Sequence, residues 1–440
     1  MHVGGVAIFE VPELGFDYEK LVTLISTRIG LVPRYRQRVR WVPGHLANPI
    51  WVDDENFDIT FHVRRSALPR PGNHDQLADL VGRIMSRPLD RNRPLWEMYL
   101  VEGLADHKFA VLSKTHHAMV DGLSAIDIGQ VILDLNPIPR EVISDPWRPR
   151  REPSRLDLVA SAVADSVRRP QLLWESASAA ASDARATVSR LAGAVVGVAS
   201  MARTMARTAP PSPLNTLIGE QRRYGMVDTK LDDYKRVRKV HGGTVNDAVL
   251  AVVSGALRSW LMTRGEAVTG RSIIRAMVPV SVRQAGHSEG NRVSSYLVDL
   301  PVGEPDPVIR LHRISYLMAG HKESGQAVAA EVLVGISGFA PPTLHSLGAR
   351  TGSQLSRRFF NVVVSNVPGP QFPLYAEGAR MLAAYPVVPL AKGQALSIGV
   401  TSYDGGVFYG LNADRDAMYD VDVLAACINE AMDELISTVR

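Results

Sequence analysis

Cysteine is nearly missing from this chain, which has a single thiol, Cys427, among 440 residues. One cysteine excludes a disulfide within the chain and fits a reducing compartment. Cys427 lies in a C-terminal segment with helical spacing of apolar residues, and a lone thiol in such a pattern more often fills a core position than acts as a nucleophile. We therefore predict that Cys427 packs in the core.

Long apolar runs are missing too. No window reaches the roughly 20 apolar residues that span a bilayer. The N-terminus, Met-His-Val-Gly-Gly, has no basic region followed by an apolar stretch, so a secretory signal is not indicated. We expect a cytoplasmic protein, and peripheral contact with the inner face of the membrane or with lipid droplets is compatible with this expectation.

Several common catalytic signatures do not occur. The sequence contains no Gly-rich phosphate loop, no His/Cys cluster with the spacing of metal ligands, and no Gly-x-Ser-x-Gly elbow. These absences argue against a nucleotide-phosphate loop, a metal centre and a covalent serine acyl-enzyme.

Lysine is scarce, since it supplies 8 of the 49 basic residues and arginine supplies the other 41, and the net charge is +4. Most of this arginine is interpreted as solvated surface, although an arginine excess also suits an anionic ligand. No basic module interleaved with aromatic residues indicates nucleic acid. We expect no nucleic-acid partner.

The chain is long enough for two domains of ordinary size, and its 46% apolar and 21% charged residues are typical of a soluble globular enzyme. The composition divides it into a mixed α/β half (1–145), a Pro/Arg-rich and helical connection (146–215), and a second mixed α/β half (216–440). The connection is mildly basic, and we favour helices packed across a domain junction over helices lying on an anionic lipid surface. The predicted fold class is α/β with two related domains.

Apolar periodicity predicts the main elements of both halves. The helix that begins near residue 245 has Thr244 or Asn246 as its N-cap. The expected strands are 3–11, 96–101, 109–112, 273–282 and 360–365, the expected helices are 18–29, 77–85 and 123–135, and the expected hairpin spans 396–411.

The most informative segment is the octapeptide Thr-His-His-Ala-Met-Val-Asp-Gly, residues 115–122, where a strand pattern changes to a helix pattern. A neutral imidazole, with a solution pKa of about 6.5, can take a proton from an alcohol that attacks a carbonyl and then return it to the leaving group. Spacing does not indicate whether His116 or His117 does this. Asp121 could orient the ring or bind an arginine, and the Gly122 N–H could help to hold developing negative charge.

Two other interpretations of this segment stay open. Adjacent side chains diverge and no third His or Cys lies nearby, so metal binding is disfavoured. Satisfied core histidines are as well supported by the residues alone as a catalytic base. If the segment is catalytic, the missing serine elbow leaves direct transfer with a histidine as base.

The segment His116-His117-x-x-x-Asp121-Gly122 resembles the motif of the chloramphenicol-acetyltransferase-like superfamily. Five further segments, in this order, make the chain similar from His2 to its C-terminus to the bacterial wax ester synthase/diacylglycerol acyltransferase family. These are Pro94-Leu95-Trp96-Glu97 with Gly103, Asn246-Asp247-Ala-Val-Leu, Val278-Pro279-Val280-Ser281-Val282-Arg283, Asn361 to Pro370, and Ser402-Tyr403-Asp404-Gly405 with Gly410 and Asp414.

This resemblance implies two chloramphenicol-acetyltransferase-like domains with the active site in the channel between them. It implies transfer of a long-chain fatty acyl group from acyl-CoA to diacylglycerol, forming triacylglycerol, or to a long-chain alcohol, forming a wax ester. Acyl-CoA is then a co-substrate, and no cofactor or metal is expected.

By the same resemblance His117 is the general base, His116 is a neighbour that shapes the site, and Asp121 is a structural residue paired with either Arg36 or Arg283. The family places Asn246 and Asp247 beside the reaction centre.

We propose that the Asn246 amide holds the thioester oxyanion, although a plain N-cap role explains Asn246 at least as well. The residues expected on the substrate side, as structural or pocket-lining positions, are Trp96, Asp247, Ser365 and Asn366.

Two alternatives and one departure accompany this interpretation. A catalytically silent lipid-binding or lipid-body protein would suit the basic apolar connection, and a free-standing peptide-synthetase condensation domain would need a carrier protein. Family members usually carry a short segment before Met-His-Val-Gly-Gly, so we expect either a misassigned start or a missing piece of the first domain.

Overall fold

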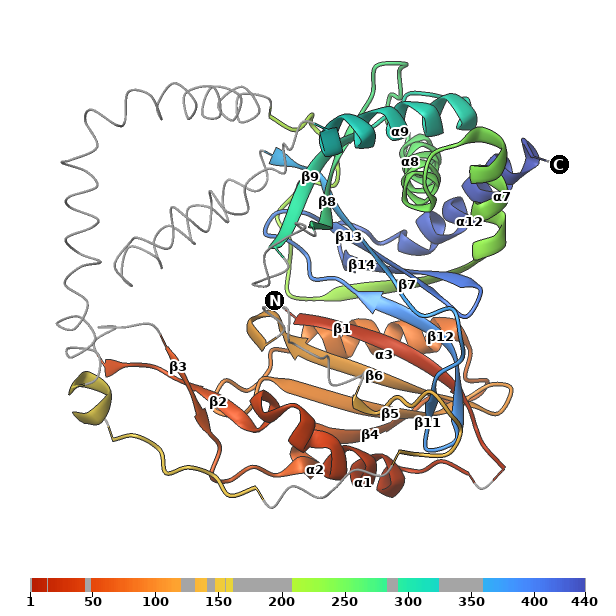
Figure 1. Cartoon of the computed structure of the whole chain (residues 1–440). Coiled ribbons are helices and arrows are strands. Elements are labelled where there is room, and N and C mark those ends of the chain that lie inside the picture. Colours follow the sequence, from red (N-terminus) through yellow and green to blue (C-terminus); the bar gives the residue numbers. More distant parts are fainter. Residues whose placement is uncertain are drawn as a thin grey trace, which may run out of the picture.

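The computed structural model describes residues 2–13, 15–43, 49–119, 131–140, 147–154, 156–160, 208–282, 292–323 and 359–439. Within these residues the strands form two six-stranded sheets and one two-stranded ribbon. One six-stranded sheet lies above the other in Figure 1, and the helices labelled α7, α8, α9 and α12 lie beyond the upper one. The mixed α/β fold class is confirmed.

The first sheet has the strand order β11-β12-β1-β6-β5-β4. Its strands are β1 (His2–Glu10), β4 (Val63–Ala67), β5 (Trp96–Leu104), β6 (Lys108–His116), β11 (Tyr375–Ala376) and β12 (Ala379–Val387). The strands predicted in this half are confirmed as β1, β5 and β6, although β6 is longer than predicted because its polar end, 113–116, is buried or half-buried beside β1.

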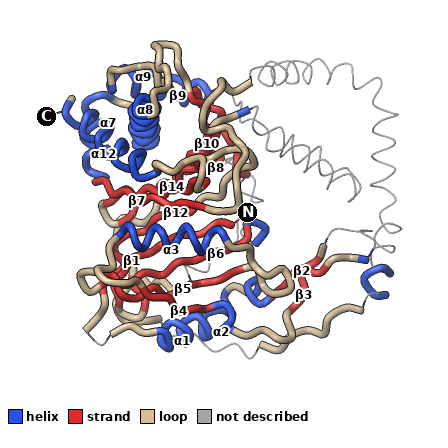
Figure 2. The backbone as a smooth tube through the Cα atoms, turned by 180° about the vertical axis from the view of Figure 1, so that it is seen from behind, coloured by secondary structure: helices blue, strands red, loops and turns tan. Residues whose placement is uncertain are grey.

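Short helices accompany this sheet. They are α1 (Tyr18–Arg28), α2 (Ile59–His62), α3 (His74–Ser86) and the 3-10 turns η1 (Ile29–Leu31), η2 (Pro33–Arg36) and η4 (His117–Met119). The α3 helix begins three residues before the predicted one because Asn73 and Gln76 form a capping box ahead of its apolar face. Figure 2 shows α3 across one face of the sheet, and α1 and α2 at its β4 edge.

Strand β12 comes from the second half of the chain but pairs with β1 of the first, with Gly4 opposite Val387 and Val6 opposite Tyr385. The predicted division at 145 and 216 did not include this exchange. Since β12 also packs against β13 and β14 of the second sheet, it joins the two sheets directly.

The second sheet has the strand order β7-β14-β13-β10-β8-β9. Its strands are β7 (Arg222–Lys230), β8 (Ile274–Val282), β9 (Arg292–Leu300), β10 (Val362–Pro368), β13 (Leu396–Tyr403) and β14 (Gly406–Asp414). The predicted hairpin is β13–β14, whose two-residue turn, Asp404-Gly405, has φ values of 42° and 84°. Positive φ at both positions is what a type I′ turn requires, and Asp-Gly suits it.

The described helices that cover this sheet are α7 (Leu231–His241), α8 (Val245–Thr263), α9 (Pro307–Glu323) and α12 (Val421–Ser437). Every residue of α8 from Asp247 to Leu257 is buried, as expected of a helix surrounded by other elements. Cys427 of α12 is buried in this core, as predicted, and burial raises the pKa of its thiol.

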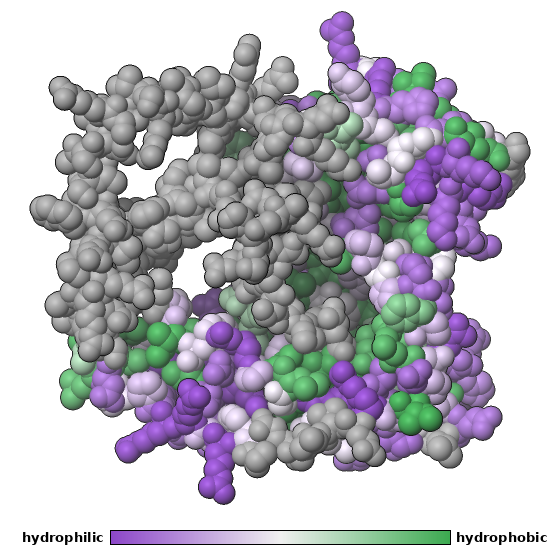
Figure 3. Space-filling view, in the orientation of Figure 1, coloured by the Kyte–Doolittle hydropathy of each residue, from purple (hydrophilic) through white to green (hydrophobic). Residues whose placement is uncertain are grey.

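The two-stranded ribbon, β2 (Gln37–Arg40) and β3 (Ile50–Asp53), pairs with neither large sheet. Figure 3 shows apolar side chains exposed in this part of the molecule, at the lower left. Directly after β2, Trp41 is 53% exposed, and Leu156, close in sequence to the Leu158 that packs with Val42 and Ile50, is 81% exposed.

Most of the predicted helix 123–135 and of the helical connection lies outside the described residues. None of the helices in the described part of the chain is both long enough and apolar enough to cross a membrane.

Candidate functional site

The two adjacent histidines lie at the exit of β6, where the strand ends at His116 and turns into η4. His116 is half-buried, His117 is exposed, and the backbone N–H of Ala118 donates to Nδ1 of His116 at 3.2 Å. Burial, together with the charges of the N-terminal amine, Arg91 and His117, lowers the pKa of His116. At neutral pH the His116 ring is therefore uncharged, and its Nδ1 remains an acceptor. The bond from Ala118 N–H to this atom closes the turn that presents His117.

A buried lysine lies two residues before the turn. Lys114 is fully buried, and its Nζ donates to the backbone oxygen of Ile84 at 2.8 Å and to that of Arg87. Burial lowers the pKa of Lys114 to about 8, while the carboxylate of Glu97 opposes the shift. Near neutral pH Lys114 is thus mainly a cation held by the carbonyls at the end of α3, where the helix dipole favours positive charge.

Trp96 lies in the core. It is fully buried, its Nε1 donates to the backbone oxygen of Tyr35 at 2.8 Å, and its ring stacks on His62 with 4.7 Å between centroids. Trp96 therefore has a packing role at the start of β5, and its expected place on the substrate side stays a prediction.

Asn246 and Asn366 are brought together from elements 120 residues apart, with Asn366 Nδ2 donating to Asn246 Oδ1 at 3.0 Å. Asn246 stands in the first turn of α8, and Asn366 lies on β10, where both side chains are half-buried. The N-cap of α8 is Thr244, so the plain N-cap explanation of Asn246 is wrong. Because Oδ1 accepts in this pair, the Nδ2 donors of Asn246 point elsewhere.

Asp247 has a structural role at the start of α8, and its expected place on the substrate side stays a prediction. Its Oδ2 accepts from the Thr244 N–H at 2.9 Å, and its own N–H donates to Thr244 Oγ1 at 3.2 Å, which forms a capping box. Ser315 of α9 donates to the same carboxylate oxygen at 3.3 Å. Since Asp247 is only 4% exposed, this carboxylate fixes the start of α8 and so the position of Asn246.

Ser365 directly precedes Asn366 on β10. It is half-buried on β10 and lies opposite Gly399 of β13, where an added Cβ would meet Val388 Cγ2 at 2.9 Å. The preceding residue, Val387, pairs with Gly4 of β1, and Gly4 pairs with Lys114 of β6. Neighbouring contacts therefore run from β10 across β13, β12 and β1 to the strand that carries the histidines.

Asp121, Gly122 and Arg283 lie outside the described residues. Of the two arginines expected beside Asp121, Arg36 is described. It is 5% exposed, and its guanidinium lies over the ring of Trp147 at 4.5 Å. The pairing of Asp121 stays a prediction.

Sequence reasoning did not identify the anchor that follows the histidine segment. Asp134 is 5% exposed, and its Oδ2 lies 2.6 Å from Arg28 Nη2 of α1. Its backbone pairs with that of Tyr375 in β11. In the sequence, the only sign of this anchor is an acidic residue within an apolar segment. The spacing of Asp134 does not indicate that Arg28 is its partner.

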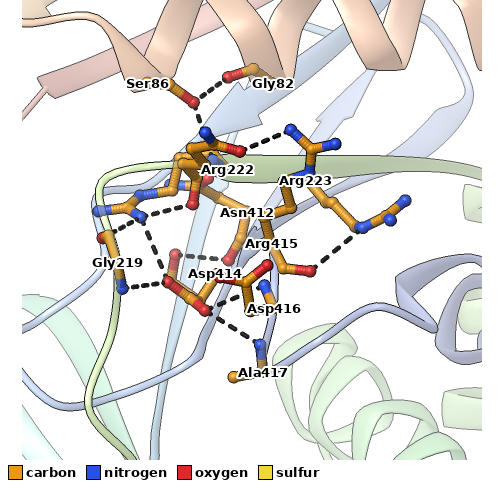
Figure 4. Close-up of polar contacts among 12 residues, drawn as sticks. Gly82, Ser86, Gly219, Arg222, Arg223, Asn412, Asp414, Arg415, Asp416 and Ala417 are labelled. Carbon is orange, nitrogen blue, oxygen red and sulfur yellow. Dashed lines mark hydrogen bonds and ion pairs between the residues drawn. The ribbon is translucent and has the colours of Figure 1, made fainter.

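Asp414 had appeared only as part of the family pattern, and Figure 4 shows its role. Its carboxylate accepts the N–H groups of Gly219 at 2.7 Å, Asp416 at 3.2 Å and Ala417 at 3.0 Å. Arg222 Nη1 lies 3.6 Å from the same carboxylate. Asp414 thus fastens the end of β14 to the segment that leads into β7.

A metal centre has no support in the described part of the chain, where no group of three or more His, Cys, Asp or Glu side chains could hold an ion. The described site instead offers an imidazole at a strand exit and a pair of amides on the neighbouring sheet. Imidazole suits proton transfer, and amide N–H groups suit an oxygen that gains negative charge.

Comparison with known families and proteins gives consistent matches. Residues 1–249 match the family model for the wax ester synthase/diacylglycerol acyltransferase catalytic domain, and residues 289–436 match that for the C-terminal domain. The chain is 35% identical over 437 residues to the Mycobacterium tuberculosis H37Rv protein named "Probable diacyglycerol O-acyltransferase tgs1", which covers 99% of this chain and 91% of that protein. It is 34% identical over 455 residues to the tgs2 protein of the same strain, covering 100% and 95%.

Solved structures agree. The structure of a wax ester synthase/diacylglycerol acyltransferase from Marinobacter aquaeolei VT8 matches with a TM-score of 0.71 and 29% identity, covering 100% of this chain and 95% of that one. The first condensation domain of the CDA synthetase matches with a TM-score of 0.58, 14% identity and coverage of 100% and 92%, which is a likeness of fold alone.

Proposed function

We propose, because the chain belongs to the wax ester synthase/diacylglycerol acyltransferase family, that it transfers a long-chain fatty acyl group from acyl-CoA to diacylglycerol and forms triacylglycerol. The observation that carries this proposal is the similarity to the tgs1 and tgs2 proteins, which extends over 99% and 100% of this chain. The two histidines at the exit of β6 supply a group with suitable chemistry.

The proposed reaction is direct. The imidazole of His117 takes the proton of the acceptor hydroxyl while that oxygen attacks the thioester carbonyl, so that a C–O bond forms and the carbonyl oxygen becomes negative. When the C–S bond breaks, the CoA sulfur takes the proton back from the imidazolium. His117 is exposed and belongs to no strand pairing, which leaves its ring accessible to a substrate. In this proposal Asp121 has a structural role and the Gly122 N–H assists in holding the negative charge.

The Asn246 amide is proposed to hold the developing oxyanion. Its Oδ1 is occupied by Asn366 Nδ2 at 3.0 Å, and this bond orients the Nδ2 donors of Asn246 away from Asn366. Asn366 then acts through Asn246, and Ser365 beside it is proposed to line the acyl or acceptor path.

Replacing Asn246 by Ala is expected to reduce kcat about a hundredfold, the usual cost of one oxyanion donor. Asn366→Ala should cost less, because it removes an orienting bond and leaves the donor. Steady-state release of thiol from palmitoyl-CoA measures both, with exposed Asn56→Ala as the matched control. If Asn366→Ala is the more damaging of the two, the roles are exchanged. An unchanged kcat in Asn246→Ala removes this residue from the reaction.

The acceptor is the second part of the proposal. With diolein and hexadecanol offered together, triolein-type product is expected to exceed wax ester, as the similarity to the tgs proteins suggests. Quantifying both products from radiolabelled palmitoyl-CoA in one reaction decides between them. An excess of wax ester would make the chain a wax ester synthase with the same chemistry.

The proposed reaction takes place at a lipid surface, because both diacylglycerol and long-chain alcohols are insoluble in water. We infer peripheral contact with the membrane or with lipid droplets, supported by the exposed apolar side chains near the ribbon. Flotation on diolein-containing vesicles tests the contact within the same assay. Flotation without any CoA release would instead favour the catalytically silent lipid-binding protein.

A further inference from the structure

We propose that His2 is a positioning residue for the reaction, which holds His116 from the neighbouring strand beside the C-terminal end of α3. This inference rests on the proposed function, because the turn that His116 closes is the one that presents His117. Neither the family matches nor the named relatives assign a role to His2.

The first support is strand register. His2 of β1 lies directly opposite His116 of β6, and directly opposed residues of antiparallel strands have their side chains on the same face. The two ring centroids are 6.2 Å apart with an interplanar angle of 74°, an edge-to-face arrangement. The edge of one imidazole therefore faces the other and limits the rotation of His116.

The second support is the end of α3 on that same face. Lys114 of β6 donates to the carbonyl of Ile84 at 2.8 Å and to that of Arg87, and the Met85 backbone in the last turn of α3 acts on the His2 ring and opposes the lowering of its pKa. The end of α3, which attracts donors and cations, therefore adjoins His2 of β1 and fixes Lys114 of β6.

The third support is that α3 is itself fixed by the second sheet. Ser86 Oγ accepts the backbone N–H of Arg222 in β7 at 2.8 Å, and a Cβ on Gly82 would meet the Arg222 carbonyl oxygen at 2.7 Å (Figure 4). The helix can lie this close to β7 only with glycine at that position. The end of α3 is therefore held from both sheets, and His2 adjoins both that end and His116.

The role of His2 is to keep the His116 ring in place and neutral. Within the part of the chain that the structure describes, the charged and titratable groups that act on His116 or on His2 beside it are the N-terminal amine, Lys114 and His117 at the end of β6, and Arg91 after α3. None of them is an acid, and burial lowers the pKa of His116. Burial and the Lys114 ammonium lower the pKa of His2 to about 3, so His2 stays neutral and adds bulk without charge.

Removing that bulk admits water to His116. Its pKa should then rise towards the ordinary value, and protonation of Nδ1 would break the bond from Ala118 N–H at a higher pH than in the wild type. Activity would accordingly be lost earlier on acidification, because the turn that presents His117 opens.

The test compares His2→Ala with His2→Asn, whose side chain restores polar bulk opposite His116, and with His74→Ala at the exposed far end of α3. His2→Ala is expected to lower kcat about tenfold or more with KM for palmitoyl-CoA within about twofold, as for a misplaced catalytic group. The acid limb of its pH–rate profile should move to higher pH. His2→Asn should recover most of the loss, and His74→Ala should match the wild type.

A readout independent of activity keeps this inference separate from the proposed function. In an NMR titration, the His116 ring should protonate at higher pH in His2→Ala than in the wild type, even if the enzyme accepts neither diolein nor hexadecanol. An unchanged His116 titration together with an unchanged pH–rate profile overturns the proposal. If His2→Ala does not fold, the His116 titration and the pH–rate profile are measured on His2→Asn and His2→Phe. Wild-type values of both quantities in both variants then overturn the proposal.

Discussion

His117→Ala is expected to reduce the transfer of palmitate from palmitoyl-CoA to diolein about a thousandfold, within the range that a positioned general base contributes. The ring is exposed at the exit of β6, outside the strand pairing, so its removal leaves the fold intact. The loss should appear in kcat with little change in KM, because the base acts in the transition state and not in the binding of acyl-CoA. Release of CoA thiol, followed with a thiol reagent, measures it.

The matched variant is His116→Asn, whose side-chain oxygen can replace Nδ1 as the acceptor for the Ala118 N–H. It should retain far more activity than His117→Ala, and both should melt at the wild-type temperature. Turnover at the wild-type rate in His117→Ala would refute the assigned base. If His116→Asn proves the inactive one, the base is His116.

Gly410→Ala is expected to destabilise the chain by about 3 kcal/mol or more, because the added methyl cannot be accommodated by a side-chain movement alone. A Cβ at Gly410 of β14 would lie 2.0 Å from the Pro386 carbonyl oxygen and 2.3 Å from the Tyr224 hydroxyl. The Pro386 oxygen is backbone and also accepts from Tyr224 at 3.0 Å, so β12 itself would have to move. A lowered midpoint of unfolding in urea or on heating measures the effect.

The activity of Gly410→Ala should fall together with its stability. Strand β12 pairs with β1, and β1 pairs with β6, so a shift of β12 would displace the strand that ends at the histidines. Gly5→Ala is the control, because a Cβ at this strand glycine meets Tyr385 O at 3.7 Å and Ser113 Oγ at 3.9 Å, which are ordinary contacts. A wild-type midpoint in Gly410→Ala would show that the two sheets are packed less closely at Pro386 than these distances require.

Periodicity and turn chemistry were sufficient to predict β1, α1 and the β13–β14 hairpin to within one or two residues at most ends. Each depends on side chains of neighbouring residues, such as the Asp404-Gly405 pair that permits positive φ. The start of α8 was predicted equally well, but only the tertiary structure shows that its N-cap is Thr244 and not Asn246. The capping box joins Thr244 to Asp247 and leaves the Asn246 side chain for Asn366.

Contacts between distant segments could not be predicted in this way. Trp96 has the same apolar neighbours in the sequence whether it lines a pocket or stacks on His62, and only the packing of α2 against β5 shows the second. The exchange of β12 into the first sheet likewise depends on Gly399 and Gly410, which leave room for Pro386 and Val388.

The order of residues was enough to establish the mixed α/β class, the paired histidines at the end of a strand and the family to which they belong, because these follow from short-range pattern and from motif order. Tertiary structure was needed to place His2 against His116, Asn366 against Asn246 and β12 between the sheets. Local patterns report which face of an element is buried, whereas its partner is selected by close packing and hydrogen bonding between residues far apart in the chain.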